Sequence, residues 1–319
     1  MLTTHSIFEQ MNELGAEKVP FFFMIDFLKE KGEVIPLEDL SSDIQFSMHE
    51  DQLNTPPIDF SFDKFPISAK EYQKQFKIVH DHLLFGNSYL TNLTCRTPIN
   101  TNLSLQQIYT HTQAKYKLNY KNQFVCFSPE IFVQIKDGKI ASYPMKGTID
   151  AAIDDARSKI LSDEKEAAEH ATIVDLIRND LSLVANEVTV TKYRYIDELI
   201  TNEKRLLQVS SEIVGQLPTN YHEQLGTIFD QLLPAGSICG APKKKTVEII
   251  LEAENYNRNF YTGVFGIFDG KNVDSAVMIR FIERENEQLI FKSGGGITAK
   301  SDCESEYNEM IQKVYVPIY

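Results

Sequence analysis

The stretch FVCFSPEIFVQIKDGKIAS, at positions 124–142, carries the strongest indication of the fold class. It contains three short runs rich in apolar residues, at 124–127, 131–135 and 139–142. Short runs of β-branched and aromatic residues are typical of strands. Asp137-Gly138 separates the last two runs, and an Asp-Gly pair between strands is typical of a tight hairpin. The stretch therefore predicts neighbouring antiparallel strands, not strands joined by crossover helices.

The rest of the chain continues this pattern of strands with a few helices between them. We expect helices at Ser68–Leu84, Asp163–Val184, Lys245–Glu254 and Glu304–Tyr315. Further strands are expected at Pro20–Phe27, Ser88–Cys95, Tyr261–Phe268, Ser275–Glu283 and Gln288–Lys292. This order indicates an α+β fold, a mixed or antiparallel α/β layered arrangement. We expect one domain over residues 1–319, in which strands and turns at 1–65 complete a core region at 66–319.

The composition excludes some classes of partner. The chain has 45 acidic and 32 basic residues, a formal charge of −13, whereas nucleic-acid binding needs a basic surface. Cys95, Cys126, Cys239 and Cys303 lie far apart and form no Cys-x-x-Cys pair, which indicates reduced thiols rather than a disulfide or zinc framework. No signal peptide is recognisable, and no apolar run approaches the roughly 20 residues that span a bilayer. We therefore expect a cytoplasmic protein.

Two of the expected helices each carry a pair of glutamates on their apolar side. In Asp163–Val184, Glu166 and Glu169 are three residues apart, so they lie within roughly 60° of each other around the helix axis. Glu306 and Glu309 repeat this spacing in the last helix. If the two faces oppose each other, four carboxylates converge, and a hard ion such as Mg²⁺ would be needed to balance them. The alternative is two ordinary amphipathic helices whose glutamates reach solvent.

A second candidate site surrounds Lys146, in the run Pro144-Met145-Lys146-Gly147-Thr148. Gly147 lets the backbone turn, so Lys146 could face a cleft at a strand end. A nucleophilic amine there would need its pKa lowered from about 10.4 toward about 7–8. Glu130 begins the hairpin that leads to Lys146 and could act in the same cleft as a proton donor or acceptor. The alternatives are a surface lysine in a turn and a turn glutamate in solvent.

Three further elements could hold an anion. Gly294-Gly295-Gly296 follows an expected strand, where bare backbone N–H groups can surround a carboxylate. The run at 236–243 is similar to a phosphate loop in composition only, because no Gly-Lys-Ser/Thr closes it. Arg280 follows apolar residues of an expected strand and needs an anionic partner there. A structural salt bridge would satisfy Arg280 equally well.

These elements, in this order, resemble those of the chorismate-utilising enzymes, and among them the aminodeoxychorismate synthases. The resemblance covers the chain from about Ile67 to its last residue. It rests on Ser128-Pro129-Glu130, Pro144-Met145-Lys146-Gly147-Thr148, the runs at 163–170 and 174–181, Gly240-Ala241-Pro242-Lys243, Tyr261-Thr262-Gly263, Ile279-Arg280, Gly294-Gly295-Gly296-Ile297 and Glu306-x-x-Glu309-x-x-x-Lys313.

The resemblance implies a large antiparallel α/β sandwich that binds chorismate and Mg²⁺ in a central cleft. Glu169 and Glu309 match the family's direct metal ligands, and Glu166 and Glu306 match ligands that act through water. The metal would hold the ring carboxylate of chorismate. The residues implied to bind the rest of the substrate are Thr148, Gly240, Ala241, Tyr261, Gly263, Arg280, Gly294, Gly295, Gly296 and Lys313.

The resemblance also implies the reaction, amination of chorismate to 4-amino-4-deoxychorismate for para-aminobenzoate and folate synthesis. Lys146 would attack ring C2 and expel the 4-hydroxyl, with Glu130 as its general acid or base, and ammonia would then add at C4 as the lysine leaves. The ammonia would come from a glutamine amidotransferase subunit or from free ammonium. A separate aminodeoxychorismate lyase would act on the product.

Some positions of this chain differ from the patterns of other chorismate-utilising enzymes, and these differences bear on the alternative functions. Isochorismate and salicylate synthases carry a water-activating lysine at the position of Leu90, so Leu90 counts against them. Anthranilate synthases carry a small residue at the position of Lys146 and a histidine that Leu207 replaces here, by alignment on Val209-Ser210. Anthranilate synthase component I therefore remains an alternative that these two residues oppose. A non-catalytic chorismate-binding subunit that activates a glutaminase is the other alternative, opposed by the presence of the glutamates and the lysine.

Overall fold

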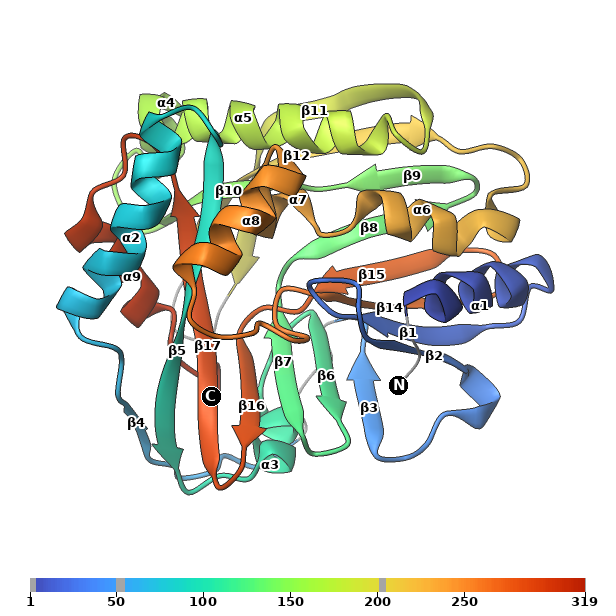
Figure 1. The fold of residues 1–319 in the computed structure, drawn as a ribbon, viewed down its shortest axis with the longest axis horizontal. Coiled ribbons are helices and arrows are strands. Elements are labelled where there is room, and N and C mark those ends of the chain that lie inside the picture. Colours follow the sequence, from blue (N-terminus) through green and yellow to red (C-terminus); the bar gives the residue numbers. More distant parts are fainter. Residues whose placement is uncertain (1–3, 50–54, 201–204, 319) are drawn as a thin grey trace.

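Two antiparallel sheets form the centre of the molecule (Figure 1). The computed structural model describes residues 4–49, 55–200 and 205–318. Within them, the first sheet has nine strands, namely β1 (Phe21–Ile25), β2 (Gly32–Pro36), β8 (Ile131–Lys136), β9 (Lys139–Ser142), β10 (Met145–Asp150), β11 (Asn186–Ile200), β12 (Arg205–Gln216), β14 (Val264–Phe268) and β15 (Val273–Val277). The second has eight, namely β3 (Ile44–Ser47), β4 (Phe62–Lys64), β5 (Leu90–Thr101), β6 (Tyr116–Tyr120), β7 (Phe124–Ser128), β13 (Gly240–Ala241), β16 (Phe281–Glu285) and β17 (Gln288–Ile297).

The strand order shows how the sheets are built. The first sheet runs β10-β12-β9-β8-β15-β14-β1-β2, with β11 on the other edge of β12, and the second runs β13-β5-β17-β16-β7-β6-β3, with β4 beside β5. Strands of the two sheets cross one another in Figure 1. All pairings among the described strands are antiparallel, which confirms the expected α+β sandwich.

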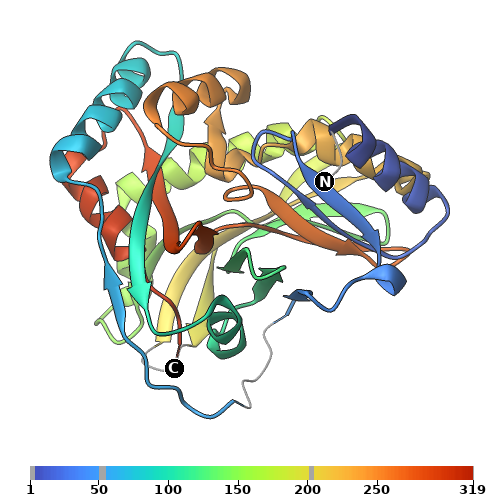
Figure 2. The same cartoon turned by 60° about the horizontal axis from the view of Figure 1, so that its bottom comes forward.

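Helices cover the outer faces of the sheets. The first sheet is covered by α1 (Thr4–Ala16), α5 (Glu164–Leu181) and α6 (Leu225–Leu232), and the second by α2 (Ala69–Leu84), α3 (Leu105–His111), α8 (Lys243–Ala253) and α9 (Cys303–Gln312). The short elements are α4 (Ala156–Ser162), α7 (Gly236–Cys239), η1 (Leu37–Asp39) and η2 (Tyr221–Gln224). Figure 2 shows α2 (cyan) and α9 (red) lying together. None of the described helices combines the length and apolar character that a bilayer crossing requires.

The hairpin expected around Asp137-Gly138 is present between β8 and β9. Ile135 pairs with Ile140, and both turn residues have positive φ, 50° and 77°. A two-residue hairpin turn of this kind requires positive φ at both positions, which Asp and Gly tolerate. The local sequence therefore accounts for this part of the first sheet.

The continuous apolar run of β1 reflects burial on both faces. Phe22 and Met24 point into the core between the two sheets, together with Phe281 of β16. Phe21 and Phe23 point the other way, into the core beneath the helices. Side chains alternate across a strand, so a strand buried on both faces must be apolar throughout.

The four expected helices are present, and α2 and α5 each begin with a side-chain cap. The hydroxyl of Ser68 accepts from the backbone of Glu71, whose carboxylate accepts from Ser68 in return, so α2 starts with a capping box. Asp163 caps α5 by accepting from the backbone of Glu166 at 2.9 Å. Both caps lie one residue before the helix, as sequence patterns of this kind predict.

The N-terminal segment differs from the expectation of strands and turns alone, because residues Thr4–Ala16 form α1. Ile7, Phe8 and Met11 are buried against α6 and the first sheet, and Leu14 packs against the same core. Their spacing of one, three and three residues is that of a helical stripe. The prediction was wrong here although the sequence contained this signal.

The expected single strand at Ser275–Glu283 is broken at Met278–Arg280, where the chain passes from the first sheet to the second. A second crossing, at Pro129–Glu130, joins β7 to β8. Two backbone hydrogen bonds join the crossings. The Val277 N–H donates to the Glu130 carbonyl at 3.1 Å, and the Phe127 N–H donates to the Arg280 carbonyl at 3.3 Å. The fold thereby holds Glu130 and Arg280 at the junction of the sheets.

Candidate active site

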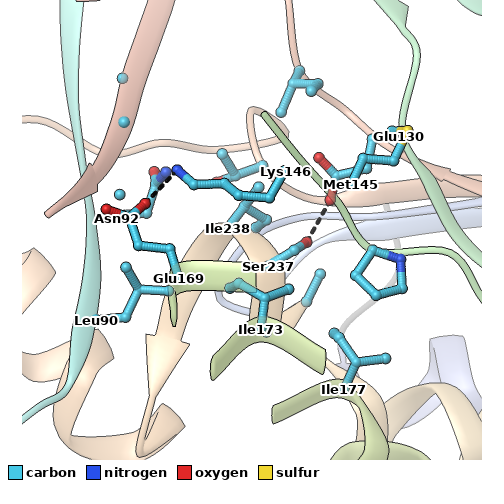
Figure 3. A pocket seen from close by; sticks show the side chains of 18 of the residues that line it. Leu90, Asn92, Glu130, Met145, Lys146, Glu169, Ile173, Ile177, Ser237 and Ile238 are labelled. Atoms are coloured by element: carbon cyan, nitrogen blue, oxygen red, sulfur yellow. Dashed lines mark hydrogen bonds and ion pairs between the residues drawn. The ribbon is translucent and has the colours of Figure 1, made fainter. Parts of the chain in front are cut away.

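A cavity of about 1320 Å³ is lined by residues of both sheets, α5, α7, α9 and the segment that follows α9 (Figure 3). Most of the residues expected in the site line it. They are Glu130, Lys146, Thr148, Glu166, Glu169, Tyr261, Arg280, Gly294, Gly295, Gly296, Glu309 and Lys313. Residues far apart in the sequence, from 130 to 313, therefore meet around one space.

Lys146 lies near the start of β10 and reaches Glu169 on α5. Its Nζ lies 2.7 Å from the Glu169 Oε2, and Figure 3 shows this pair as a dashed line. The pairing of β10 with β12 shifts register between Met145 and Thr148, and Gly147 has φ of 82°. This irregularity turns the lysine out of the regular ladder, as a bulge does.

The charge state of Lys146 differs from the one expected of a free nucleophile. Burial lowers the pKa of the amine, but the hydrogen bond to Glu169 and the negative charges of Glu169, Glu166 and Glu309 outweigh burial and raise the pKa overall. The lysine is therefore an ammonium ion held by carboxylates. The lowered pKa that nucleophilic attack needs is not a property of this arrangement.

Three of the four glutamates, Glu166, Glu169 and Glu309, interact electrostatically with Lys146. Glu306 Oε2 and Glu309 Oε1 lie 3.4 Å and 3.5 Å from the point where a side chain on Gly295 would begin. Glu166 Oε2 lies 3.3 Å from the corresponding point on Gly147, next to Lys146. Among the described residues, no three acidic, histidine or cysteine side chains are close enough together to form a ready metal centre. The donor set, four carboxylates from α5 and α9, nevertheless fits the chemistry of Mg²⁺, which takes oxygen ligands and keeps several waters.

Glu130 is held by a residue that the sequence patterns did not single out. The hydroxyl of Ser237, on α7, donates to Glu130 Oε1, as the dashed line in Figure 3 shows. Burial raises the pKa of the Glu130 carboxyl, while the Ser237 hydrogen bond and the charge of Lys313 oppose part of that rise. A carboxyl with a raised pKa retains a proton more readily, which suits a proton donor.

Arg280 faces the cavity with its backbone in the left-handed region, at φ of 50°. Its guanidinium lies 5.3 Å from the ring centre of Tyr315, which also lines the cavity. Tyr261, nearby in the lining, is 4% exposed, and burial raises the pKa of its phenol, which stays neutral. Non-glycine residues with positive φ are uncommon and often occur at functional sites.

The three glycines lie within β17, not in a loop after it. Gly294, Gly295 and Gly296 pair with Thr94, Leu93 and Asn92 of β5 in the second sheet. The Gly294 carbonyl accepts from Lys313 Nζ at 2.9 Å. The strand expected to end at Lys292 therefore extends through the glycines, because the ladder with β5 continues to Ile297.

Four of the expected site residues stand apart from the cavity lining. Gly240 and Ala241 form β13 and pair with Thr91 and Leu90 of β5. A side chain on Gly240 would begin 1.8 Å from the Leu90 carbonyl, so glycine permits this close approach. Gly263 packs in the same way, with a would-be Cβ 2.2 Å from the Ile25 carbonyl. The fourth is Glu306, which adjoins the lining through Gly295.

The position that faces Thr148 is Gln208, not Leu207. Gln208 pairs with Thr148 across β10 and β12, and its Nε2 lies 3.5 Å from the Thr148 hydroxyl. Leu207 is buried and pairs with Ile149, so it points to the opposite face of the sheet. Neither position carries a histidine, and the alignment of Leu207 with the family's histidine stays a prediction.

Sequence reasoning missed Ser237 and Tyr315. Ser237 lies in the run at 236–243 that was compared with phosphate loops, but nothing local connects it to Glu130, 107 residues away. Tyr315 lies just beyond α9, and its only signal was its place two residues after Lys313. Both residues act through contacts that form on folding.

Comparison with known proteins agrees with the geometry. The model of the chorismate binding enzyme family matches residues 33–318. An uncharacterized PabA-like protein of Haemophilus influenzae is 51% identical over 320 residues, 99% of this chain and 98% of its own length. Aminodeoxychorismate synthase component 1 of Escherichia coli strain K12 is 31% identical over 264 residues, 78% of this chain and 57% of its own length.

Solved structures share the fold. The menaquinone-specific isochorismate synthase MenF of Escherichia coli superposes with a TM-score of 0.69 at 14% identity, over 97% of this chain and 80% of MenF. Anthranilate synthase component I of Streptococcus pneumoniae superposes with a TM-score of 0.64 at 26% identity, over 83% of this chain and 60% of that one. The family match, the shared fold and the cavity together lead to one conclusion: this chain belongs to the chorismate-binding enzyme family.

Proposed function

We propose that this chain aminates chorismate to 4-amino-4-deoxychorismate. The observation that carries the proposal is the presence of Lys146 in the cavity that also contains Glu130. The resemblance supports this choice, because it implies a lysine at this position in aminodeoxychorismate synthases and a small residue in anthranilate synthases. The relative in Escherichia coli that bears this activity is similar over most of the present chain.

Each step of the proposed reaction has a residue in the cavity. The Lys146 nitrogen forms a bond to ring C2 while the ring double bonds shift and the C4–O bond breaks. Glu130 gives its proton to the departing hydroxyl, which leaves as water. Ammonia then forms a bond at C4, the double bonds shift back and the lysine nitrogen leaves C2 as the amine. The proton that the new C4 nitrogen loses returns to Glu130. The pair with Glu169 holds Lys146 as an ammonium ion, so the lysine must lose a proton to solvent before it attacks.

Binding of the substrate would use groups of both charges. Arg280 offers a guanidinium to the enolpyruvyl carboxylate, and Tyr261 lies on the same side as a neutral phenol. Glu169 and Glu309 would hold Mg²⁺, with Glu166 and Glu306 acting through water, and the ion would neutralise the ring carboxylate. The proposed ammonia source is a glutamine amidotransferase subunit or free ammonium, and a separate lyase would convert the product to para-aminobenzoate.

The test is an assay of the purified chain with chorismate, Mg²⁺ and an ammonium salt, with and without an aminodeoxychorismate lyase. We expect para-aminobenzoate only when the lyase is present, and we expect Lys146→Ala to lower its formation by about 10³-fold or more, the scale of a lost catalytic group. Lys300→Ala, which changes an exposed lysine of the cavity rim, is the matched control. Anthranilate formed without lyase, or full activity of Lys146→Ala, would refute the proposal.

A further inference from the structure

Each of the two glutamates proposed as direct metal ligands is bound by a lysine. Lys146 Nζ lies 2.7 Å from Glu169 Oε2, and Lys313 Nζ lies 2.8 Å from Glu309 Oε1. The two lysines come from different parts of the chain, one from β10 and one from the residue after α9. Both line the cavity, and both have proposed roles toward the substrate.

The two ion pairs belong to one cluster. Lys146 interacts electrostatically with Glu309 as well as with Glu169 and Glu166. The point where a side chain on Gly295 would begin lies 3.5 Å from Glu309 Oε1 and 3.8 Å from Lys313 Nζ. The ammonium groups therefore balance the carboxylates at the place where the cation is proposed to bind.

A divalent ion and an ammonium group compete for such carboxylates. Mg²⁺ binds oxygen at about 2.0–2.1 Å in a strict octahedral geometry, so a ligand oxygen cannot keep an ammonium group in the same direction. Two ammonium groups carry the same charge as one Mg²⁺. The carboxylates therefore keep the same compensating charge after the exchange.

We propose that Lys146 and Lys313 hold the carboxylates that the divalent ion takes, so that binding of the ion displaces both lysines toward the substrate. This inference rests on the metal site of the proposed function. Binding of the ion and movement of Lys146 toward the substrate would then occur together. An ion already bound is then a condition for the lysine to reach ring C2.

The two ion pairs differ in exposure. This difference predicts which lysine, when removed, increases the affinity for the ion more. The side chains of Lys146 and Glu169 are 34% and 17% exposed, whereas those of Lys313 and Glu309 are 47% and 52% exposed. Solvent screens an exposed pair more strongly. Removal of Lys146 should therefore favour the ion more than removal of Lys313.

The experiment is calorimetric titration of the full chain with MgCl₂, repeated with MnCl₂, at one pH and without chorismate. We expect Lys146→Met to tighten metal binding by about tenfold and Lys313→Met by about two- to threefold, as expected for partly screened pairs. Lys146→Arg keeps the charge and the pair, so its affinity should equal that of the original chain or fall below it. Lys300→Met removes the charge of a cavity lysine that forms no ion pair with the described residues. The affinity of this variant for the metal should change less than twofold.

The control separates competition from simple charge repulsion. An equal effect of Lys146→Met and Lys300→Met, or no tightening in folded Lys146→Met, would overturn the inference while leaving the proposed reaction open to its own assay. If neither the original chain nor the Lys146→Met/Lys313→Met double variant binds either ion, both the inference and the metal site fail. Binding by the double variant alone would be the strongest support for competition.

Discussion

Ser237 and Glu130 show how one hydroxyl can orient a reacting group. The Ser237 hydroxyl takes one carboxylate oxygen of Glu130, which leaves the second oxygen for the substrate. Glu130 is fixed on its other side by the backbone, since its carbonyl accepts from Val277. Ser237 is thus a positioning residue for the proposed proton donor.

Ser237→Ala should lower kcat by about tenfold and change KM less than twofold, because the substrate contacts remain while the proton donor loses its orientation. The Ser237 hydrogen bond lowers the pKa of Glu130, so its removal should raise that pKa further. Activity that needs protonated Glu130 is present below its pKa and lost as the pH rises. The fall in kcat at high pH should therefore move to higher pH in the variant.

The measurement is the pH profile of kcat for the original chain, Ser237→Ala and Ser237→Thr. Threonine keeps the hydroxyl and should restore both rate and profile. Ser142→Ala is the control, because Ser142 lines the same cavity but donates to the Phe132 carbonyl. An unchanged high-pH limb in Ser237→Ala would show that the serine does not position Glu130.

At the scale of single elements, α9 packs against α2 as well as on β17. The rings of Tyr72 on α2 and Tyr307 on α9 lie 5.4 Å apart, and Tyr307 lies between Glu306 and Glu309 in the sequence. The start of α2 is set by the capping box of Ser68 and Glu71. A local sequence signal at one helix thus supports the helix that carries half of the proposed metal ligands.

Ser68→Ala should lower the free energy of unfolding by about 1 kcal/mol, because the first turn of α2 loses its cap. The measurement is urea unfolding followed by circular dichroism. Ser182→Ala is the matched control, since Ser182 follows α5 and its exposed hydroxyl donates back to the Arg178 carbonyl. Equal losses in both variants would argue against a specific role of the α2 cap.

At the scale of the whole molecule, a buried ion pair joins several elements behind the cavity. Arg258 and Glu254 are each 1% exposed and 2.6 Å apart. Arg258 also donates to the carbonyls of Asn92 on β5 and Ile238 on α7, and Glu254 accepts from the backbone of Thr94. The pair connects the second sheet to the short helix that carries Ser237.

Arg258→Met should lower the free energy of unfolding by about 3–5 kcal/mol, because Glu254 is left as an uncompensated buried charge. Glu254→Met/Arg258→Met should recover part of that loss, since it removes both charges. Urea unfolding of both variants is the measurement. Lys77→Met, which breaks the exposed pair with Asp81, should cost less than about 0.5 kcal/mol. If Arg258→Met lowered the free energy of unfolding by no more than Lys77→Met does, the buried pair would not hold these elements together.

Much of the fold, and the types of side chain in the candidate site, could be predicted because they depend on local sequence patterns. The Asp137-Gly138 turn, the caps at Ser68 and Asp163 and the i,i+3 glutamates depend on residues a few positions apart, where helix and strand geometry dictate the outcome. The helix at Thr4–Ala16 had the same kind of signal and was missed. The broken strand before Arg280 had none, because a change of sheet depends on what packs on either side.

The arrangement of the proposed reacting groups came from long-range packing. Lys146 meets Glu169, Ser237 meets Glu130, and the glycines of β17 continue a ladder with β5, all across separations that no local pattern encodes. The amino-acid order therefore specified a lysine and four glutamates of the right chemical type. Their pairing, and with it the raised pKa of Lys146, follows from burying both sheets and two helices around one cavity, where opposite charges must compensate each other.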